Sequence, residues 1–586
     1  MKKGFSLIDV VISVAIIVML FGGIYLVYFS ILDTVNNLEI RGAATSVFNR
    51  QVEILRNMTY DSVGTQGGVP AGAIPQIQVI KFDNVNFTVK TTVRNIDDPF
   101  DGTLGGTPND TAPADYKLVE LEVSCLTCLK FVPMVFTTTV APKNLESAST
   151  NGSIFINVFD AIGSSVSAAN VHVVNASVTP TIDLTDATNA SGVLQLVGVP
   201  TSTQSYQISV SKAGYSSDQT YPIGAAGNPN PTKPHATVAA QTVTAISFAI
   251  DKVSRVNVDS SGLRCEAIPN IHFSMNGTRL IGTNPDVLKF TTSTNTGSSS
   301  SKSLNNIEWD TYSFPLNEAS YDLLGTVPLS PMIVNPSSTY DFRFVVQPTA
   351  PKSLLVTVKN SVNGNGVLEA SVNLTKSGFQ ASAITGHSFL RETDWSGGQY
   401  AAQDGGLDTG NPAGTIKLLA NASSTYSTST TSWLVSNTFD VGSSTASFYG
   451  LNWNPQVQPS QTGSDSLKFQ LASNNDNATW NFVGPDGTAT SYYVASSSNV
   501  WSGLSGNRYL RYKVYFSTAD ENYTPRLDDV SVEFKGVCVP PSQALFNNLA
   551  SGDYDITVSA TGYNPATSSV SVVGNWTQAE ILLQPQ

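Results

Sequence analysis

The first 33 residues constrain this chain most, because they include an apolar run long enough to cross a lipid bilayer. The run extends from Val10 to Leu32 and follows the short segment Met1–Asp9. As a helix with a rise of about 1.5 Å per residue, roughly 23 residues span about 34 Å, which exceeds a hydrocarbon core of about 30 Å. The segment Asp33-Thr34-Val35-Asn36 follows directly, without the small-residue cleavage site of a secretory signal peptide. We therefore expect the run to remain in the mature protein.

The residues before the run carry a short motif. Gly4-Phe5-Ser6-Leu7-Ile8-Asp9 resembles the prepilin cleavage and methylation site of type IV pilins and pseudopilins. The resemblance implies that a prepilin peptidase cuts between Gly4 and Phe5 and methylates the new amino group of Phe5. It also implies that Asp9, which replaces the usual glutamate, pairs with the N-terminal amine of a neighbouring subunit. The alternatives are an ordinary signal anchor and an interfacial acid without a partner.

The residues after the run predict a pilin-like domain. Residues 36–60 place apolar side chains at helical spacing, and 76–93, 118–124 and 131–140 alternate as paired strands do. A long helix packed on a small antiparallel sheet is the shape of a pilin, and a stalk helix beside an unrelated β domain is the alternative. The expected divisions are the leader at 1–4, the helix at 5–60 and the globular β domain at 61–145.

The composition indicates an extracellular all-β protein with several domains. The chain has 586 residues, more than one domain usually contains, and only 13% of them are charged. Serine, threonine, asparagine, glycine and proline, which form turns between short strands, are abundant. A general nucleic-acid surface would be basic, whereas the net charge is −13, so no nucleic-acid partner is expected.

Beyond residue 143 short predicted strands alternate with turns. Residues 150–250 resemble a carboxypeptidase regulatory-like domain, a prealbumin-type β-sandwich, in the turn Asp186–Gly192 and the ending Lys212–Tyr215. The resemblance implies a module that is not itself catalytic. Residues 253–350 predict another Ig-like or prealbumin-like sandwich of similar size.

A similar ending returns near the C-terminus, at Gln543–Tyr563, whereas the matching opening strands lie at Lys352–Leu374. We therefore predict a second carboxypeptidase regulatory-like sandwich, split into 352–392 and 537–586, with 393–536 inserted at a loop. The insert resembles jelly-roll or discoidin-like sandwiches of secreted bacterial proteins. The expected fold class is mainly β, with a long N-terminal transmembrane helix on a small antiparallel sheet, followed by tandem β-sandwich domains.

The insert contains five of the chain's seven tryptophans. Exposed aromatic side chains on such domains often stack on sugar rings, so these tryptophans are candidates for a ligand platform. The alternative is that they fill the core of the insert. The five are Trp395, Trp433, Trp453, Trp480 and Trp501.

The four cysteines are too few for a disulfide-rich scaffold. Cys125 and Cys128 stand between two predicted strands, where two intervening residues suit a tight hairpin. A disulfide across this turn, free thiols, and metal or redox chemistry all remain open. Cys265 and Cys538 are far apart in sequence, and no pairing is predicted for them.

An acidic, glycine-rich loop offers oxygen ligands of the kind that calcium prefers. Asp97, Asp98 and Asp101 are the weak candidates, and a solvated loop is the expected alternative because no EF-hand spacing is present. We expect no other metal and no cofactor.

Catalytic residues do not converge in the sequence. The four histidines are scattered and form no His-Glu-x-x-His pair, and neither a nucleophile elbow with triad partners nor a phosphate loop is present. We therefore expect no enzymatic activity.

The predicted function is a minor or tip subunit of a type IV pilus or pseudopilus, because a large arm on every subunit would crowd a filament. The expected partners are prepilin peptidase, other pilin subunits, the cytoplasmic membrane, and an extracellular glycan or cell-surface ligand. The protein would cross the cytoplasmic membrane once before assembly and become part of an extracellular pilus afterwards. Two alternatives remain: a monomeric, membrane-anchored, glycan-binding surface protein, and a membrane-tethered glycan hydrolase.

Overall fold

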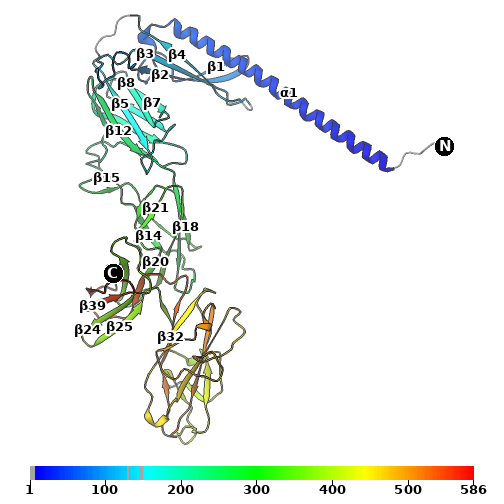
Figure 1. Ribbon diagram of the computed structural model, residues 1–586, viewed down its shortest axis with the longest axis vertical. Coiled ribbons are helices and arrows are strands. Elements are labelled where there is room, and N and C mark those ends of the chain that lie inside the picture. Colours follow the sequence, from blue (N-terminus) through cyan, green and yellow to red (C-terminus); the bar gives the residue numbers. More distant parts are fainter. Residues whose placement is uncertain (1–6, 129–130, 144–148) are drawn as a thin grey trace, which may run out of the picture. The chain divides into compact units, whose positions relative to one another are not determined.

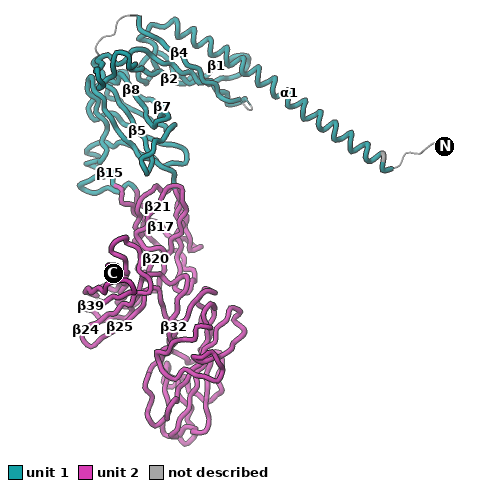
Figure 2. The backbone as a smooth tube through the Cα atoms, viewed as in Figure 1, with its two compact units in different colours: residues 1–253, 280–289 teal, residues 254–279, 290–586 magenta. Residues whose placement is uncertain are grey.

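The computed structural model describes residues 7–128, 131–143 and 149–586. The chain divides into two compact units (Figure 2), of which unit 1 comprises Met1–Val253 and Leu280–Lys289 and unit 2 comprises Ser254–Arg279 and Phe290–Gln586. Strands dominate both units, and one long apolar helix stands at the N-terminus (Figure 1). The predicted fold class, mainly β with one long helix, is therefore confirmed.

The helix α1 (Leu7–Arg56) is continuous, but its two halves have different surroundings. The C-terminal half buries Ala44, Val47 and Leu55 in a core shared with the sheet, whereas the apolar side chains of the N-terminal half are exposed. Burial of an aliphatic side chain contributes about 1.5–3 kcal/mol, so the C-terminal half is fixed to the sheet by packing.

The sheet beneath α1 is antiparallel, with the strand order β1-β2-β3-β4. Its strands are β1 (Ile77–Phe82), β2 (Val85–Ile96), β3 (Tyr116–Ser124) and β4 (Met134–Val140). Asp83 and Asn84 form the turn between β1 and β2 with positive φ angles of 44° and 64°, as expected for a two-residue hairpin. Phe48 of α1 stacks on Phe136 of β4, with 4.0 Å between ring centroids.

The rest of unit 1 is a β-sandwich of two sheets around one core. One sheet has the order β12-β5-β8, and the other has β10-β9-β6-β7 with β11 beside β9. The strands are β5 (Gly152–Phe159), β6 (Asn170–Asn175), β7 (Ile182–Ala187), β8 (Val193–Val199), β9 (Ser202–Ser211), β10 (Asp218–Gln219), β11 (Ala236–Val238) and β12 (Val243–Ala249). The short strands β15 (Leu280–Gly282) and β16 (Val287–Leu288) also belong to unit 1.

Polar contacts join the helix-bearing sheet to this sandwich. The Arg94 guanidinium donates two hydrogen bonds to the Asp186 carboxylate, at 2.7 and 2.6 Å, and both side chains are largely buried. Asn95 Nδ2 donates to the Val197 carbonyl at 2.8 Å, and Gln76 Nε2 donates to the Asp183 carbonyl at 2.7 Å. A bidentate arginine–carboxylate pair has a defined geometry, so these contacts link the sandwich to the sheet within unit 1.

Unit 2 begins with a sandwich whose main sheet has the order β18-β13-β22-β20. Its core includes Phe273, Phe314, Phe342 and Phe344. The strands are β13 (Ser254–Ser261), β14 (His272–Asn276), β17 (Thr291–Asn295), β18 (Ser301–Ile307), β19 (Asp310–Tyr312), β20 (Tyr321–Val327), β21 (Met332–Val334) and β22 (Thr339–Pro348).

The next sandwich is assembled from two separate parts of the chain. Strand β23 (Ser353–Asn360) pairs antiparallel with β38 (Gln543–Phe546) and parallel with β41 (Trp576–Leu583). The facing sheet has the order β25-β24-β39-β40. Its strands are β24 (Ser371–Lys376), β25 (Phe379–Ile384), β39 (Gly552–Ser559) and β40 (Ala566–Val572).

The inserted segment contains three sheets and its own core. Two of the sheets enclose the core: one has the order β26-β37-β32-β34, and the other has the order β27-β30-β35-β31 with β33 beside β35. The third sheet has the order β28-β29-β36. The strands of the insert are β26 (Ser388–Glu392), β27 (Ala402–Gln403), β28 (Leu407–Gly410), β29 (Ala413–Leu418), β30 (Ser432–Val435), β31 (Phe439–Asp440), β32 (Ser447–Asn454), β33 (Leu467–Asn474), β34 (Ser498–Asn499), β35 (Tyr509–Phe516), β36 (Arg526–Leu527) and β37 (Asp529–Lys535). Single 3-10 turns lie at Tyr60–Ser62, Ser396–Gly398, Ser460–Thr462 and Ser502–Leu504.

The cysteines form two disulfides, one of which the sequence did not suggest. Cys265 and Cys538, for which the sequence predicts no pairing, are bonded to each other across a sequence separation of 273. Cys125 and Cys128 are also bonded, but the expected two-residue hairpin between the flanking strands is wrong, because Val123 pairs with Met134 and the connection is longer.

The Cys265–Cys538 bond joins the first sandwich of unit 2 to the segment that leads from the insert back into the split sandwich. Arg343 Nη1 lies 3.2 Å from Cys538 Sγ. Gly442 of the insert packs against the same loop, since a Cβ at Gly442 would lie 2.0 Å from the Arg264 carbonyl oxygen. The loop that carries Cys265 therefore contacts parts of the chain that are distant in sequence.

We predict that replacing Cys265 and Cys538 with alanine lowers the free energy of unfolding of unit 2 by about 3–5 kcal/mol, because the bond closes a long loop in the unfolded chain. Differential scanning calorimetry of the full-length protein would show a lower transition temperature. Replacing Cys125 and Cys128, which close a loop of sequence separation 3 in unit 1, serves as the control and should leave the unit 2 transition unchanged. Identical transitions for the wild type and the Cys265/Cys538 variant would contradict the prediction.

Candidate functional site

The largest apolar surface among the described residues is the N-terminal half of α1. From Leu7 to Val35 its large apolar side chains are exposed; Leu7 is 83% and Met19 77% accessible. The most apolar stretch of 18 residues in this helix has a mean hydropathy of 2.8, and none of it is buried. Gly4 and Phe5 of the sequence motif lie outside the described residues, as does the side chain of Asp9.

An exposed apolar helix of this length has a simple physical consequence. Each large aliphatic side chain loses about 1.5–3 kcal/mol of favourable transfer free energy when it stays in water. The helix is long enough to span a bilayer, and the same surface can also pack against other apolar helices. The segment Leu7–Val35 is therefore suited to insertion in lipid or to packing against other apolar helices.

The structure separates the five candidate tryptophans of the insert into two groups. Trp395 and Trp453 lie in the core, with 0% and 4% of their surfaces accessible, so the prediction that they stack on a ligand is wrong. Both fill space between the sheets, as large aromatic side chains commonly do. Trp433 and Trp480 are half-buried at the surface, and Trp501 is 36% accessible and packs against Gly487 and Gly503.

Two surface tryptophans are covered by cations of strand β35. Lys513 Nζ lies 4.3 Å from the centroid of the Trp433 ring, and the Arg511 guanidinium lies 4.4 Å from the centroid of the Trp480 ring. Burial lowers the pKa of both Lys513 and Arg511, and the nearby Asp404 carboxylate opposes this shift at Lys513. The aromatic surface of the insert therefore carries positive charge, which was not predicted from the sequence.

The three weak calcium candidates are not gathered around one point. Asp97 accepts the Leu104 N–H at 3.0 Å, while Asp98 accepts the Phe100 N–H at 3.1 Å. Burial, followed by the charges of neighbouring aspartates, raises the pKa of Asp97, and the Leu104 N–H partly offsets this. Asp101 is exposed. Across the described part of the chain, no group of three or more His, Cys, Asp or Glu side chains is arranged to hold a metal ion, and we assign none to this loop.

A half-buried carboxyl group, that of Glu392, contacts the core of the insert. Tyr512 Oη donates to Glu392 Oε2 at 2.5 Å, and Trp395 Nε1 donates to Tyr512 Oη at 2.7 Å. Burial raises the pKa of Glu392 to about 7, and the hydrogen bonds from Tyr512 and Trp395 only partly offset this. Glu392 thus has the pKa of a general acid, but it is held in a packed hydrogen-bonded chain with the core tryptophan.

His387 connects the insert to the split sandwich. Its imidazole lies 2.6 Å from Glu369 and 2.8 Å from Glu533, and it stacks on Tyr449 with 4.3 Å between ring centroids. Burial alone would lower the pKa of His387, but the hydrogen bonds and charges of the two glutamates outweigh it and raise the pKa. Lys535 also pairs with Glu369. These contacts position the insert and leave the imidazole without a free nitrogen for catalysis.

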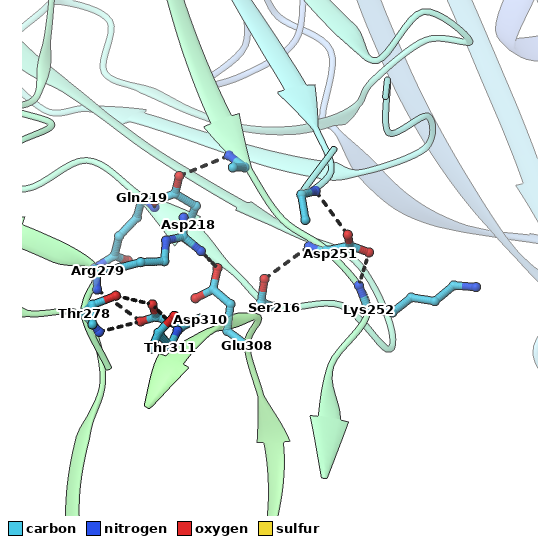
Figure 3. Close-up of polar contacts among 12 residues, drawn as sticks. Ser216, Asp218, Gln219, Asp251, Lys252, Thr278, Arg279, Glu308, Asp310 and Thr311 are labelled. Atoms are coloured by element: carbon cyan, nitrogen blue, oxygen red, sulfur yellow. Dashed lines mark hydrogen bonds and ion pairs between the residues drawn. The ribbon is translucent and has the colours of Figure 1, made fainter. Parts of the chain in front are cut away.

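Other polar clusters stabilise loops. Figure 3 shows that Asp310 accepts the backbone N–H groups of Thr278 and Arg279, at 2.9 and 3.1 Å, and the Thr278 hydroxyl at 2.6 Å. Arg279 also pairs with Glu308. In unit 1, the Asp251 carboxylate accepts two backbone N–H groups, those of Ala161 and Lys252. Because these carboxylates are engaged by the protein itself, the clusters account for loop conformation only.

Neither a protein-family model nor a curated protein matches the chain. Among solved structures, the Bacillus anthracis TIE protein aligns with 88% of this chain and 61% of its own, at 9% identity and a TM-score of 0.15. This chain thus spans less than two thirds of that protein. A streptococcal ancillary pilin aligns over 39% of this chain and 75% of its own, at 9% identity and a TM-score of 0.17. GBS52, the minor pilin of Streptococcus agalactiae, aligns over 34% and 99%, at 10% identity and a TM-score of 0.15. Superpositions this poor establish no relationship and carry no functional inference.

We predict that Glu392→Gln removes a pH-dependent destabilisation of the insert. Because the folded-state pKa is raised, the folded protein holds a proton that the unfolded chain releases, so wild-type stability falls as pH rises from about 4.5 through 7. The variant should lose less stability than wild type across this range, with the remaining pH dependence coming from groups such as His387, and it should be more stable than wild type by about 1–3 kcal/mol at about pH 8. Thermal unfolding at about pH 5 and about pH 8 measures the difference, with the exposed Glu521→Gln as the control. A variant that keeps the wild-type pH dependence would show that Glu392 titrates normally.

Proposed function

We propose that this protein is a pilin-like subunit whose N-terminal helix anchors it in the cytoplasmic membrane and then packs among the helices of other subunits. One observation carries the proposal: α1 is a single helix, half of which is packed on its own sheet while the apolar half, Leu7–Val35, is exposed. Such a helix serves as a membrane anchor before assembly and as a helix–helix interface afterwards.

The N-terminal motif supports the finer form of the proposal. Gly4-Phe5 is the cleavage point for a prepilin peptidase, which methylates the amino group of Phe5, and Asp9 pairs with the N-terminal amine of the neighbouring subunit. The amine and the carboxylate carry opposite charges, and an apolar helix bundle favours their pairing because each is costly there alone. This assignment specifies a type IV pilus or pseudopilus.

The β-sandwich modules form the arm of the subunit, and we propose a non-enzymatic binding role for it. The arm extends from residue 149 to 586, so it contains most of the chain. An arm of this size on every subunit would crowd a filament lattice, which favours a minor or tip position.

We predict that Asp9→Asn lowers the amount of protein in sheared surface filaments on the order of tenfold, because loss of a charged hydrogen bond costs about 1.5–3 kcal/mol. The amount in the membrane fraction should stay the same, since the apolar run is unchanged. Immunoblots of the two fractions measure the ratio. Asp9→Glu should retain assembly, and Glu39→Gln, at an exposed acid further along α1, is the matched control.

The assembly role would be contradicted if wild type, Asp9→Asn and Glu39→Gln all partitioned equally, with all of the protein in the membrane fraction. That outcome would favour the monomeric, membrane-anchored surface protein, which needs the same exposed helix but no neighbouring subunit.

A further inference from the structure

The sheet of the insert that contains β35 has one face in the core and one at the surface. Side chains along a strand alternate between the two faces. Leu510, Tyr512, Val514 and Phe516 of β35 are fully buried. The intervening residues, Tyr509, Arg511, Lys513 and Tyr515, are half-buried on the other face.

The strands beside β35 complete this face. Tyr515 lies opposite Trp433 of β30 and opposite Lys468 of β33. Directly opposed residues in antiparallel strands have Cβ atoms about 4.5–5.5 Å apart, so these three side chains form one row across three strands. Lys513, in the next row, lies opposite Gln470. We call the surface formed by Trp433, Lys468, Tyr492, Arg511, Lys513 and Tyr515 the cation–aromatic face.

Cations and rings alternate along the cation–aromatic face. Lys513 Nζ lies 4.3 Å from the Trp433 centroid and 5.0 Å from the Tyr515 centroid. Tyr515 meets Tyr492 edge-on, with 5.3 Å between centroids, and Lys468 Nζ lies 4.3 Å from the Tyr492 centroid. Tyr515 Oη donates to Gln470 Oε1 at 2.8 Å. These contacts restrict the side chains before any ligand arrives, which reduces the entropy lost on binding.

The charge of the face differs from that of the whole protein. The chain has a net charge of −13, but among the described residues neither Lys468 nor Lys513 forms an ion pair with a carboxylate. Arg511 donates to the Thr438 hydroxyl at 2.9 Å rather than to an acid. Asp404 is the nearby carboxylate that acts on Lys513, and it accepts a hydrogen bond from the backbone N–H of Trp433 at 3.2 Å. The face therefore offers two ammonium groups and a guanidinium without full compensation.

We propose that the cation–aromatic face binds an anionic polysaccharide, whose acidic groups pair with Lys468 and Lys513 and whose sugar rings contact Trp433, Tyr492 and Tyr515. Aromatic rings suit the apolar faces of sugars, and ammonium groups suit carboxylates or sulfates. The proposal deepens the binding role proposed above for the arm and names its ligand class.

The spacing of the cations favours a sparsely charged polymer over a nucleic acid. A nucleic-acid strand carries one phosphate about every 3.4 Å, and its binding depends on neutralising many of them. The face provides three cations on strands about 4.8 Å apart, in a chain that is acidic overall. An acidic polysaccharide needs fewer cations for the same length of contact.

The test uses the full-length protein in detergent micelles, so that neither processing nor assembly is needed for binding. Affinity electrophoresis would compare gels containing polygalacturonate, chondroitin sulfate, neutral dextran or oligodeoxythymidine. We expect retardation by at least one anionic polysaccharide, weakening with added salt, and none by dextran. Retardation by polygalacturonate alone would identify a polymer charged only by carboxylates as the ligand, and retardation by chondroitin sulfate alone would identify a sulfated polymer.

The variant Lys468→Gln/Lys513→Gln should bind at least tenfold more weakly. Its matched control is Lys90→Gln/Lys302→Gln, which removes the same charge from exposed positions elsewhere and should bind like wild type. Thermal unfolding of both variants checks that they fold. Any one of four results would overturn the proposal. These are equal binding by the two double variants, binding to dextran as strong as to the acidic polymers, no binding to any polymer, and tighter binding to oligodeoxythymidine. The Asp9 variants test assembly separately, so either proposal can fail without the other.

Discussion

The exposed apolar half of α1 is the constraint on which the rest of the structure depends. About 20 large apolar side chains are exposed on this half of the helix. Leaving them all in water, compared with burying them, costs on the order of several tens of kcal/mol in transfer free energy. The C-terminal half of the same helix is packed against β1–β4, so the helix cannot retreat into its own domain. The exposed half is suited to insertion in lipid or to packing against other apolar surfaces.

The modules are joined by contacts that resist local motion. Arg94 and Asp186 fix the first sandwich to the helix-bearing sheet in unit 1, and the Cys265–Cys538 disulfide joins distant segments in unit 2. His387, between Glu369 and Glu533, holds the insert at the point where the chain enters and leaves it. Within each unit, these contacts restrict the motion of neighbouring modules.

Much of the fold followed from periodicity. The apolar spacing of α1 and the alternation in β1–β4 and β23–β24 are local signals, and the structure has helices and strands there. The Cys265–Cys538 pairing could not be predicted, since it depends on the tertiary approach of two loops 273 residues apart in sequence. The hairpin expected at Cys125 and Cys128 failed because the register of β3 and β4 is set by Val123 and Met134, beyond the cysteines.

The positions of two tryptophans, in the core or at the surface, were predictable from the alternation of side chains along their strands. In β32, Trp453 lies two residues after Leu451, so both side chains point into the core. In β30, Trp433 directly precedes the buried Leu434, so its side chain faces outward. The alternation of Tyr509–Phe516, with Arg511 and Lys513 between apolar residues, marks the cation–aromatic face in the same way. The partners Lys468 and Tyr492 come from other strands and loops, so only the folded chain brings them together.

The mature N-terminus tests the central claim most directly. Mass spectrometry of the protein from membrane and sheared surface fractions would determine where the chain begins and whether its amino group is methylated. The account predicts N-methyl-Phe5 as the first residue, with processed protein in the sheared fraction. An intact Met1, or a cut at another position, in protein confined to the membrane would contradict it.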